Sequence, residues 1–237
     1  MPATKIAIVT GAGRGLGRSM AQHLARAGVG VIGSYRDRQG EADPLVADIQ
    51  FAGGPGAVRQ LDVGKSQTFA QFSAEVQTLL AGFGRDRFDY LVNNAGFGVY
   101  AAHAETTEEQ VDELFCVNVK GPLFLTQALL PLMADGGRIL NVSSGVARFT
   151  GPGYAAYAAA KGAIEVLTRY QAKELGERQV RVNTLVPGAV ATDFGGGLVR
   201  DNEHDNDMVA SVIALGRVGV ADDIGAAVPA ILSDSLG

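Results

Sequence analysis

The sequence predicts a doubly wound α/β fold of three layers (α/β/α), with a parallel sheet of six to seven strands. Short apolar runs alternate with longer segments of helical periodicity, as expected for a parallel sheet covered on both faces. Apolar residues make up 47% of the 237 residues, enough for a large core. No linker, composition shift or internal repeat divides the chain, so we expect a single domain over residues 1–237.

Apolar runs bounded by turn residues predict strands at 6–9, 31–34, 57–61, 90–92, 138–142 and 181–186. Apolar residues three or four apart predict helices at 16–27, 40–52, 66–80, 107–133, 154–175 and 222–232. Gly121–Pro122 predicts a bend or break in the fourth helix. The segment 188–210 is glycine-rich and then acidic, which predicts a mobile substrate lid with short helices.

Composition and charge exclude several classes of protein. The net charge is -5 with no basic block, which gives no indication of a nucleic-acid partner. The single cysteine, Cys116, rules out an intrachain disulfide and fits a reducing cytosol. The chain is expected to enter a strand within five residues, leaving no room for a signal peptide, and no apolar run reaches the ~18 residues of a membrane span. The single cysteine and the expected lack of a signal peptide predict a cytoplasmic protein. The three histidines are scattered and form no ligand cluster, so we expect no bound metal.

A glycine-rich segment, Thr-Gly-Ala-Gly-Arg-Gly-Leu-Gly at 10–17, joins the first strand to the first helix. Glycines permit the tight turn and let backbone N–H groups approach a pyrophosphate, and the helix N-terminus adds its positive dipole. In this position the segment predicts dinucleotide binding in a Rossmann-type fold. The residues expected to contact the cofactor here are Gly11, Arg14, Gly15, Leu16 and Gly17.

The end of the second strand indicates which cofactor is bound. NAD-specific sites usually carry an acid there for the ribose 2′-hydroxyl, whereas this chain has Ser34-Tyr35-Arg36. Arg36 and Arg14 would converge on a 2′-phosphate, which a guanidinium binds in a forked geometry. Asp37 follows directly and is interpreted as facing solvent. We therefore expect NADP(H) to be preferred, with NAD(H) possible.

Two further strand ends carry candidate cofactor contacts. Asp62 is placed to accept from the adenine amino group beside Val63, although a lone Asp after a strand is more often a helix cap or turn residue. The small and amide residues Asn94, Ala95 and Gly96 follow the fourth strand and let the backbone pass close to the cofactor. Such segments meet at the carboxyl edge of a parallel sheet.

Tyr157 and Lys161 lie four residues apart on the helix expected at 154–175, so they share a face. A free phenol titrates near pH ~10, and an adjacent ammonium favours its ionised form. The pair is therefore suited to general acid/base chemistry at neutral pH. Taken alone, the same spacing is common by chance and fits an ordinary alanine-rich helix better, so the rest of the chain must decide.

Five motifs, taken together, resemble the short-chain dehydrogenase/reductase family. They are Thr-Gly-x-x-x-Gly-x-Gly at 10–17, Asn-Asn-Ala-Gly at 93–96, Ser144, Tyr-x-x-x-Lys at 157–161 and Pro-Gly at 187–188. Their order and spacing are similar to those of the compact single-domain branch, which includes 3-oxoacyl-carrier-protein reductases and glucose dehydrogenases. The resemblance covers essentially the whole chain.

The resemblance implies a role for each catalytic candidate. Tyr157 resembles the general acid/base, and Lys161 the lysine that lowers the tyrosine pKa and binds the nicotinamide ribose, so both are also expected to contact the cofactor. Ser144 matches the hydroxyl that holds the substrate carbonyl, with Ser143 as an adjacent rival of structural role. Asn118 matches the asparagine that positions a water in the proton relay.

The resemblance extends toward the C-terminus with one departure. Pro187, Gly188, Val190 and Thr192 resemble the segment that flanks the nicotinamide. Relatives normally run on to a glycine-rich seventh strand, whereas this sequence stops at Gly237, so a further tail and its oligomer contacts are left open.

By resemblance the chain is expected to reduce a ketone with NADPH, as a carbonyl or 3-oxoacyl reductase; a sugar or secondary-alcohol dehydrogenase is the alternative. A non-catalytic NADP-sensing regulator would usually lose the Tyr or Lys, and both are present. The substrate pocket is expected to be apolar and lined by Phe97, Val146, Phe149, Tyr154, Phe194 and Leu198. The helices beginning at Thr107 and Tyr154 match the faces on which relatives pair, implying a homotetramer or homodimer.

Overall fold

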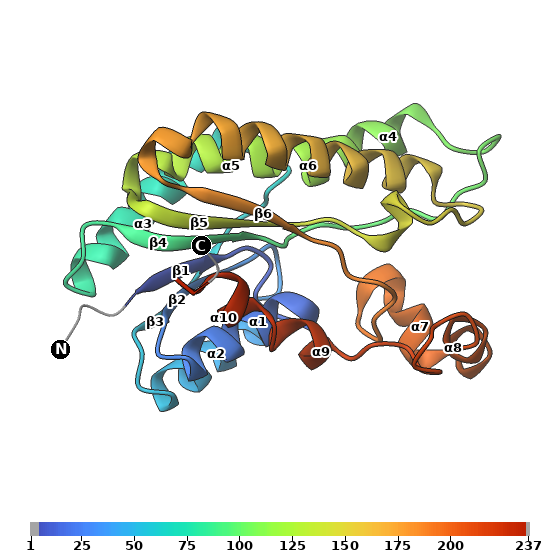
Figure 1. Cartoon of the computed structure of the whole chain (residues 1–237), viewed down its shortest axis with the longest axis horizontal. Helices are drawn as coiled ribbons and strands as arrows, with labels where there is room; N and C mark the ends of the chain where they lie inside the picture. The colour runs from blue at the N-terminus through green and yellow to red at the C-terminus, as the bar shows by residue number, and fades with distance from the viewer. Residues whose placement is uncertain (1–4, 236–237) are drawn as a thin grey trace.

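A parallel sheet of six strands forms the middle layer of the computed structural model, which describes residues 5–235 (Figure 1). The strand order is β3-β2-β1-β4-β5-β6. The bounds are β1 Ile6–Val9, β2 Gly30–Tyr35, β3 Gly56–Gln60, β4 Phe88–Asn93, β5 Met133–Val142 and β6 Arg181–Leu185.

Helices cover both faces of the sheet (Figure 1). One layer holds α3 Phe69–Gly82, α4 Glu108–Phe115, α5 Gly121–Leu129 and α6 Ala155–Glu174. The other holds α1 Gly15–Arg26, α2 Gln39–Phe51, α9 Ala221–Gly225 and α10 Val228–Ile231. The short helices α7 Leu198–Asp201 and α8 Glu203–Ala210 stand apart from both layers, beyond the carboxyl ends of the strands.

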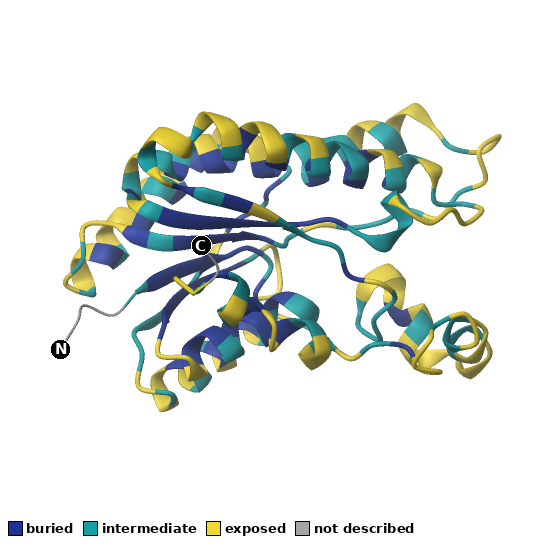
Figure 2. Ribbon diagram, viewed as in Figure 1, coloured by how far each residue is buried: buried dark blue, intermediate teal, exposed yellow. Residues whose placement is uncertain are grey.

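The central strand β1 is buried on both faces of the sheet because it is apolar at every position. Ile6 and Ile8 point into the core beneath α3 and α5, while Ala7 and Val9 point into the core beneath α1 and α2. Figure 2 shows the strands as the most continuously buried part of the chain and α7–α8 as largely exposed.

The order in which strands are added to the sheet reverses between β1 and β4, and this point fixes where ligands bind. Val9 of β1 lies opposite Gly33 of β2 on one side and Val92 of β4 on the other. The crossovers from these strands leave in opposite directions, so a crevice opens at their carboxyl ends. The predicted site segments all follow strand ends at this edge.

The structure differs from the predicted elements in three places. The strand expected at 138–142 begins earlier, at Met133, because Met133 is buried and pairs with Phe88; a bulge then absorbs the extra residues, with Gly136 at φ +74. The helix expected at 222–232 splits into α9 and α10, since Pro229 cannot donate to the Gly225 carbonyl. The described residues contain six strands and no seventh.

The long helix expected at 107–133 breaks slightly before its Gly-Pro pair. A π-helical turn at Cys116–Lys120 separates α4 from α5. By length and composition alone the run Glu108–Leu132 would suffice to cross a membrane. Its buried side chains Leu114, Leu125 and Leu129 face the protein interior, which identifies it as a core helix of this fold.

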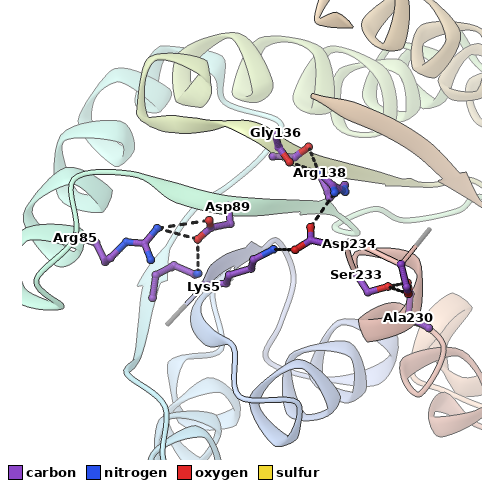
Figure 3. Close-up of polar contacts among 11 residues, drawn as sticks. Lys5, Arg85, Asp89, Gly136, Arg138, Ala230, Ser233 and Asp234 are labelled. Carbon is purple, nitrogen blue, oxygen red and sulfur yellow. Dashed lines mark hydrogen bonds and ion pairs between the residues drawn. The ribbon is translucent and has the colours of Figure 1, made fainter. Parts of the chain in front are cut away.

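A cluster of charged residues closes the amino edge of the sheet (Figure 3). The guanidinium of Arg138, on β5, is 2% exposed and donates to Asp234 Oδ1 at 2.9 Å. Lys5 Nζ donates to the other carboxylate oxygen at 2.7 Å. Arg138 also donates to the carbonyls of Gly136 and Gly137. Asp234 therefore links the last described turn of the chain to the start of β1 and to β5.

Candidate active site

Tyr157 and Lys161 lie one turn apart on α6, at the carboxyl edge of the sheet, and both are buried. The Lys161 Nζ lies 5.8 Å from the Tyr157 ring centroid and donates to the Val142 carbonyl at 2.9 Å. The last residue of β5 thus fixes the lysine, while the tyrosine hydroxyl stays free to reach Ser144.

Burial dominates the titration of both groups. It raises the pKa of Tyr157 to about 12, while a hydrogen bond with the Ser144 side chain acts in the opposite direction. Burial also lowers the pKa of Lys161 to about 8. The lowering of the tyrosine pKa expected from Lys161 is not found: desolvation disfavours the phenolate, and the Lys161 ammonium donates to the Val142 carbonyl.

Asn118 lies in the π-helical turn and brings a buried acceptor toward this pair. Its Nδ2 donates to the carbonyls of Phe97 and Leu114, each at 3.0 Å. Its Oδ1 is buried and has no partner among the described residues. A Cβ added to Gly96 would lie 2.6 Å from this oxygen and 3.3 Å from Lys161 Nζ. An acceptor left free beside Lys161 is suited to hold a water.

The two serines after β5 play different parts. Ser143 lies 3.1 Å from both the Lys161 carbonyl and Glu165 Oε1, so it ties the strand end to α6. Ser144 is instead the serine whose side chain meets Tyr157. The structure thus brings together all four residues expected in the catalytic group.

The glycine segment and the start of α1 form a cradle with free N–H donors. Gly11 adopts φ +66, and a Cβ on Gly17 would lie 2.2 Å from the Gly11 carbonyl oxygen, so both positions require glycine. The N-cap, Arg14, makes no side-chain capping bond, and the first turn carries no acid. The first amides of α1, from Gly15 and Leu16 onward, therefore fit the pyrophosphate of a dinucleotide.

The segment after β4 is fastened to this cradle. The Thr10 hydroxyl accepts from the backbone N–H groups of Asn94 and Ala95 at 3.0 and 2.9 Å. The Asn94 amide donates in return to the Thr10 carbonyl at 2.9 Å. These bonds hold Ala95 and Gly96 between the cradle and the catalytic group.

The end of β2 carries positive charge, partly matched by neighbouring acids. Arg14 and Arg36 are both exposed, and Arg36 Nε lies 3.3 Å from Asp37 Oδ2. Asp37 is exposed, as interpreted from the sequence, but it also forms this ion pair. Arg38 adds a third guanidinium, which is paired with Glu41 at 2.8 Å.

Asp62 and Val63 follow β3 as expected. Asp62 Oδ1 accepts from the Gly64 amide at 2.9 Å, and Oδ2 lies 3.6 Å from Lys65 Nζ. Asp62 thus has the turn-stabilising contact that a lone Asp after a strand often makes, and Val63 is buried. The adenine contact of Asp62 stays a prediction.

The segment after β6 returns across the crevice. The Pro187 carbonyl accepts from Gly145 at 2.8 Å, and Gly188 follows it. Val190 pairs with Gly219 in an isolated bridge. A Cβ on Gly15 would lie 3.6 Å from Thr192 Cβ, so Thr192 reaches the glycine cradle.

The expected substrate-pocket residues separate into two groups. Phe194 packs against Tyr157, with ring centroids 5.6 Å apart, and Tyr154 sits near enough to influence the Tyr157 pKa. Phe97 and Val146 are half-buried, and in the sequence they lie close to Gly96 and Ser144 respectively. Phe149 and Leu198 are instead 77% and 52% exposed.

Two residues that shape the site were not among the sequence-derived site residues. Thr10 anchors the segment after β4. Its position at the start of the glycine motif is the sequence feature from which this role could have been predicted. Gly98 lies beneath the Phe194 ring, and only the fold brings these two positions together.

The fold and the Ser-Tyr-Lys group define an oxidoreductase of the nucleotide-binding α/β class. The family model described as enoyl-(acyl carrier protein) reductase matches residues 11–237. The chain belongs to the short-chain dehydrogenase/reductase family.

Several relatives span nearly the same length. The chain is 38% identical over 233 residues to an uncharacterized oxidoreductase of Methylorubrum extorquens, covering 97% of this chain and 91% of the relative. It is 33% identical to the tetrahydroxynaphthalene reductase PfmaG of Pestalotiopsis fici, covering 98% and 86%.

Solved structures agree with the fold closely. The reductase LugOII superposes with a TM-score of 0.92 at 36% identity, covering 100% of this chain and 94% of that one. The angucycline C-6 ketoreductase LanV with bound NADP gives a TM-score of 0.92 at 33% identity, covering 99% and 91%.

Proposed function

We propose that this protein is an NADP(H)-dependent ketoreductase in which Ser144, Tyr157, Lys161 and Asn118 form the catalytic group. One observation carries the proposal: Ser144, Tyr157 and the buried Lys161 meet at the carboxyl edge of the sheet, the same edge at which the uncapped α1 begins. A proton donor at the same sheet edge as a dinucleotide-binding cradle is what the proposed reaction needs, and this arrangement supports the proposal.

The bound nicotinamide cofactor would supply or accept the hydride. Ser144 and Tyr157 bind the carbonyl oxygen of the substrate, where donors matter most because negative charge develops there. Tyr157, which is protonated at neutral pH, donates its proton to that oxygen. Lys161 and a water held by Asn118 Oδ1 then return a proton to Tyr157.

The relatives support both the reaction and the cofactor. LugOII is described as catalysing keto-reduction at C1, and LanV is described with bound NADP. A short-chain dehydrogenase from Burkholderia cenocepacia is also described in complex with NADP. Arg14, Arg36 and Arg38 supply guanidinium groups for the 2′-phosphate that distinguishes NADPH from NADH.

We further propose that the protein assembles as a homotetramer or homodimer through α5 and α6 and works in the cytoplasm. Leu123, Phe124, Val166 and Tyr170 are exposed on these helices, at 38%, 41%, 45% and 64%. Exposed apolar side chains on neighbouring helices suit an interface. Light scattering of the purified protein tests the assembly, and a monomeric mass would contradict it.

A panel of ketones assayed with NADPH and with NADH tests the central proposal. We expect oxidation of NADPH by at least one ketone and slower oxidation of NADH. Arg36→Ala should weaken NADPH binding without changing NADH binding, while Arg87→Ala, at the opposite edge, serves as the matched control. NADPH binding without turnover of any ketone would favour the regulator alternative.

A further inference from the structure

The ring of Phe194 lies over the tyrosine expected to donate the proton. Phe194 begins the 3-10 helix η6, Phe194–Gly197, in the segment between β6 and α7. Its ring centroid is 5.6 Å from that of Tyr157, at an interplanar angle of 44°. It is 46% exposed, while Tyr157 is only 6% exposed. Phe194 thus caps the space that a ketone must enter to reach Tyr157.

The floor of this space is backbone. A Cβ built on Gly98 would lie 2.7 Å from Phe194 Cζ, 3.0 Å from Cε1 and 3.6 Å from Tyr157 Cδ2. Any side chain at 98 would therefore occupy the same volume as the phenyl ring. Because residue 98 has no side chain, a slot is left open over the Tyr157 ring, and the Phe194 ring occupies it.

The segment after Phe194 is rich in glycine. Gly195, Gly196 and Gly197 follow in the left-handed region, at φ +63, +78 and +82. Arg200 bonds to Asp193 and to Asp201, and so bridges this run of glycines. The ring is held over Tyr157 by exposed ion pairs, which are weak and can open without disturbing the core.

A separate cavity of about 550 Å³ lies at the start of α6, lined by residues that include Tyr100, Gly153 and Ala155. Tyr100 meets Tyr154 edge to face, with centroids 5.3 Å apart. The cavity is within the usual size range of small-molecule sites.

We propose that Phe194 determines specificity by occupying the place of a substrate ring, so that the preferred ketones are flat and aromatic and stack against Phe194 once it swings aside. This inference rests on the proposed ketoreductase function. Aromatic rings attract each other in offset or tilted arrangements, so losing the phenyl group costs a flat substrate more than a saturated one.

The test compares 1-tetralone, a fused aromatic ketone, with cyclohexanone, using NADPH as reductant. The variant is Phe194→Leu, which keeps an apolar lid residue and removes the aromatic ring. The matched control is Phe51→Leu, because Phe51 ends α2 at the far edge of the sheet and is 96% exposed. In wild type we expect the KM for 1-tetralone to lie well below that for cyclohexanone.

Phe194→Leu should raise the KM for 1-tetralone by about tenfold and that for cyclohexanone by no more than about twofold. Phe51→Leu should change neither. Equal changes for both ketones, or none for either, would overturn the proposal, because the lid residue would then act only structurally.

A second variant and a binding measurement keep the outcome clear. Gly98→Ala should expel the Phe194 ring and weaken inhibition by 2-naphthol, a flat aromatic that is not reduced. If Gly98→Ala binds 2-naphthol as wild type does, the slot is not where the ring binds. If wild type binds NADPH yet reduces no ketone of the panel, the proposed function fails; if it reduces 1-tetralone and cyclohexanone with equal KM, or other ketones but neither of these, only this inference fails.

Discussion

Two buried cations lie at opposite edges of the sheet, and they differ in whether an acidic side chain pairs with them. Lys161, at the carboxyl edge, is 5% exposed, donates to the Val142 carbonyl and forms no ion pair within the described residues. Arg138, at the amino edge, is 2% exposed and donates to Asp234, which also binds Lys5. Burial lowers the pKa of Lys161 to about 8.

The difference separates a functional charge from a structural one. A buried charge without an acid is costly, so its persistence at Lys161 indicates a use beyond folding. A buried charge with an acid and two carbonyl acceptors, as at Arg138, is largely compensated by its surroundings, although its Nε has no partner within residues 5–235. Substitution of each cation by methionine, which removes charge and keeps an apolar chain, should therefore have different consequences.

The largest expected effect is on turnover at the carboxyl edge. Tyr157→Phe removes the proton donor and should lower kcat by about 10²–10⁴-fold, with NADPH binding nearly intact. Steady-state ketone reduction and NADPH fluorescence titration measure the two quantities. Tyr170→Phe, further along α6, is the matched control and should behave as wild type. Wild-type turnover in Tyr157→Phe would show that another group donates the proton.

The next effect is on stability at the amino edge. Arg138→Met should lower the free energy of unfolding by about 3 kcal/mol, because Asp234 and the Gly136 and Gly137 carbonyls lose their donor. Urea denaturation followed by circular dichroism measures it. Arg26→Met, an exposed arginine on α1, should change stability by no more than about 0.5 kcal/mol. If the two variants lost equal amounts of unfolding free energy, Arg138 would have no special structural role.

At the carboxyl edge the same substitution should act in the opposite direction. Lys161→Met relieves a desolvation cost of about 3 kcal/mol and loses the Val142 hydrogen bond, worth about 1. The free energy of unfolding at pH 7 should thus rise by about 2 kcal/mol. Turnover should fall sharply in the same variant.

The pH dependence of stability follows from the pKa of Lys161. In the folded protein it is about 8, below the ordinary 10.5, so the unfolded chain binds more protons between these values. Wild-type stability should therefore rise with pH across this window relative to Lys161→Met. Denaturation of both proteins at several pH values measures the difference, and a constant difference would contradict the depressed pKa.

The smallest effect concerns the acid of the amino-edge cluster. Asp234 is 70% exposed, so its pairs with Lys5 and Arg138 are screened by solvent. Asp234→Asn should lower stability by less than about 1 kcal/mol and keep turnover unchanged. A loss of unfolding free energy as large as that of Arg138→Met would mean that the ion pair with Asp234, and not the hydrogen bonds to the carbonyls, accounts for the stabilisation by Arg138.

The sequence predicted the carboxyl edge far better than the amino edge. Motifs at strand ends, from the glycine loop to Tyr157 and Lys161, lie in fixed register with the fold, so strand placement alone brings them together. Arg138 and Asp234 are 96 residues apart, and nothing local signals their pairing. The raised pKa of Tyr157 and the packing of Phe194 on Gly98 likewise depend on burial, which spacing does not report.

The predicted bounds of strands and helices are wrong where tertiary contacts override local sequence preferences. Asp135-Gly136-Gly137 resembles a loop, yet the buried Met133 draws the chain into β5. Gly225 lies so close to α1 that a Cβ would be 2.1 Å from Ser19 Oγ, a contact visible only in three dimensions.

The most direct test sets Lys161→Met beside Arg138→Met in urea denaturation at pH 7. If an unpaired buried cation marks the functional edge and a paired one the structural edge, Lys161→Met should be more stable than wild type and Arg138→Met less stable. Destabilisation of both by similar amounts would contradict the distinction, since Lys161 would then stabilise the fold as Arg138 does.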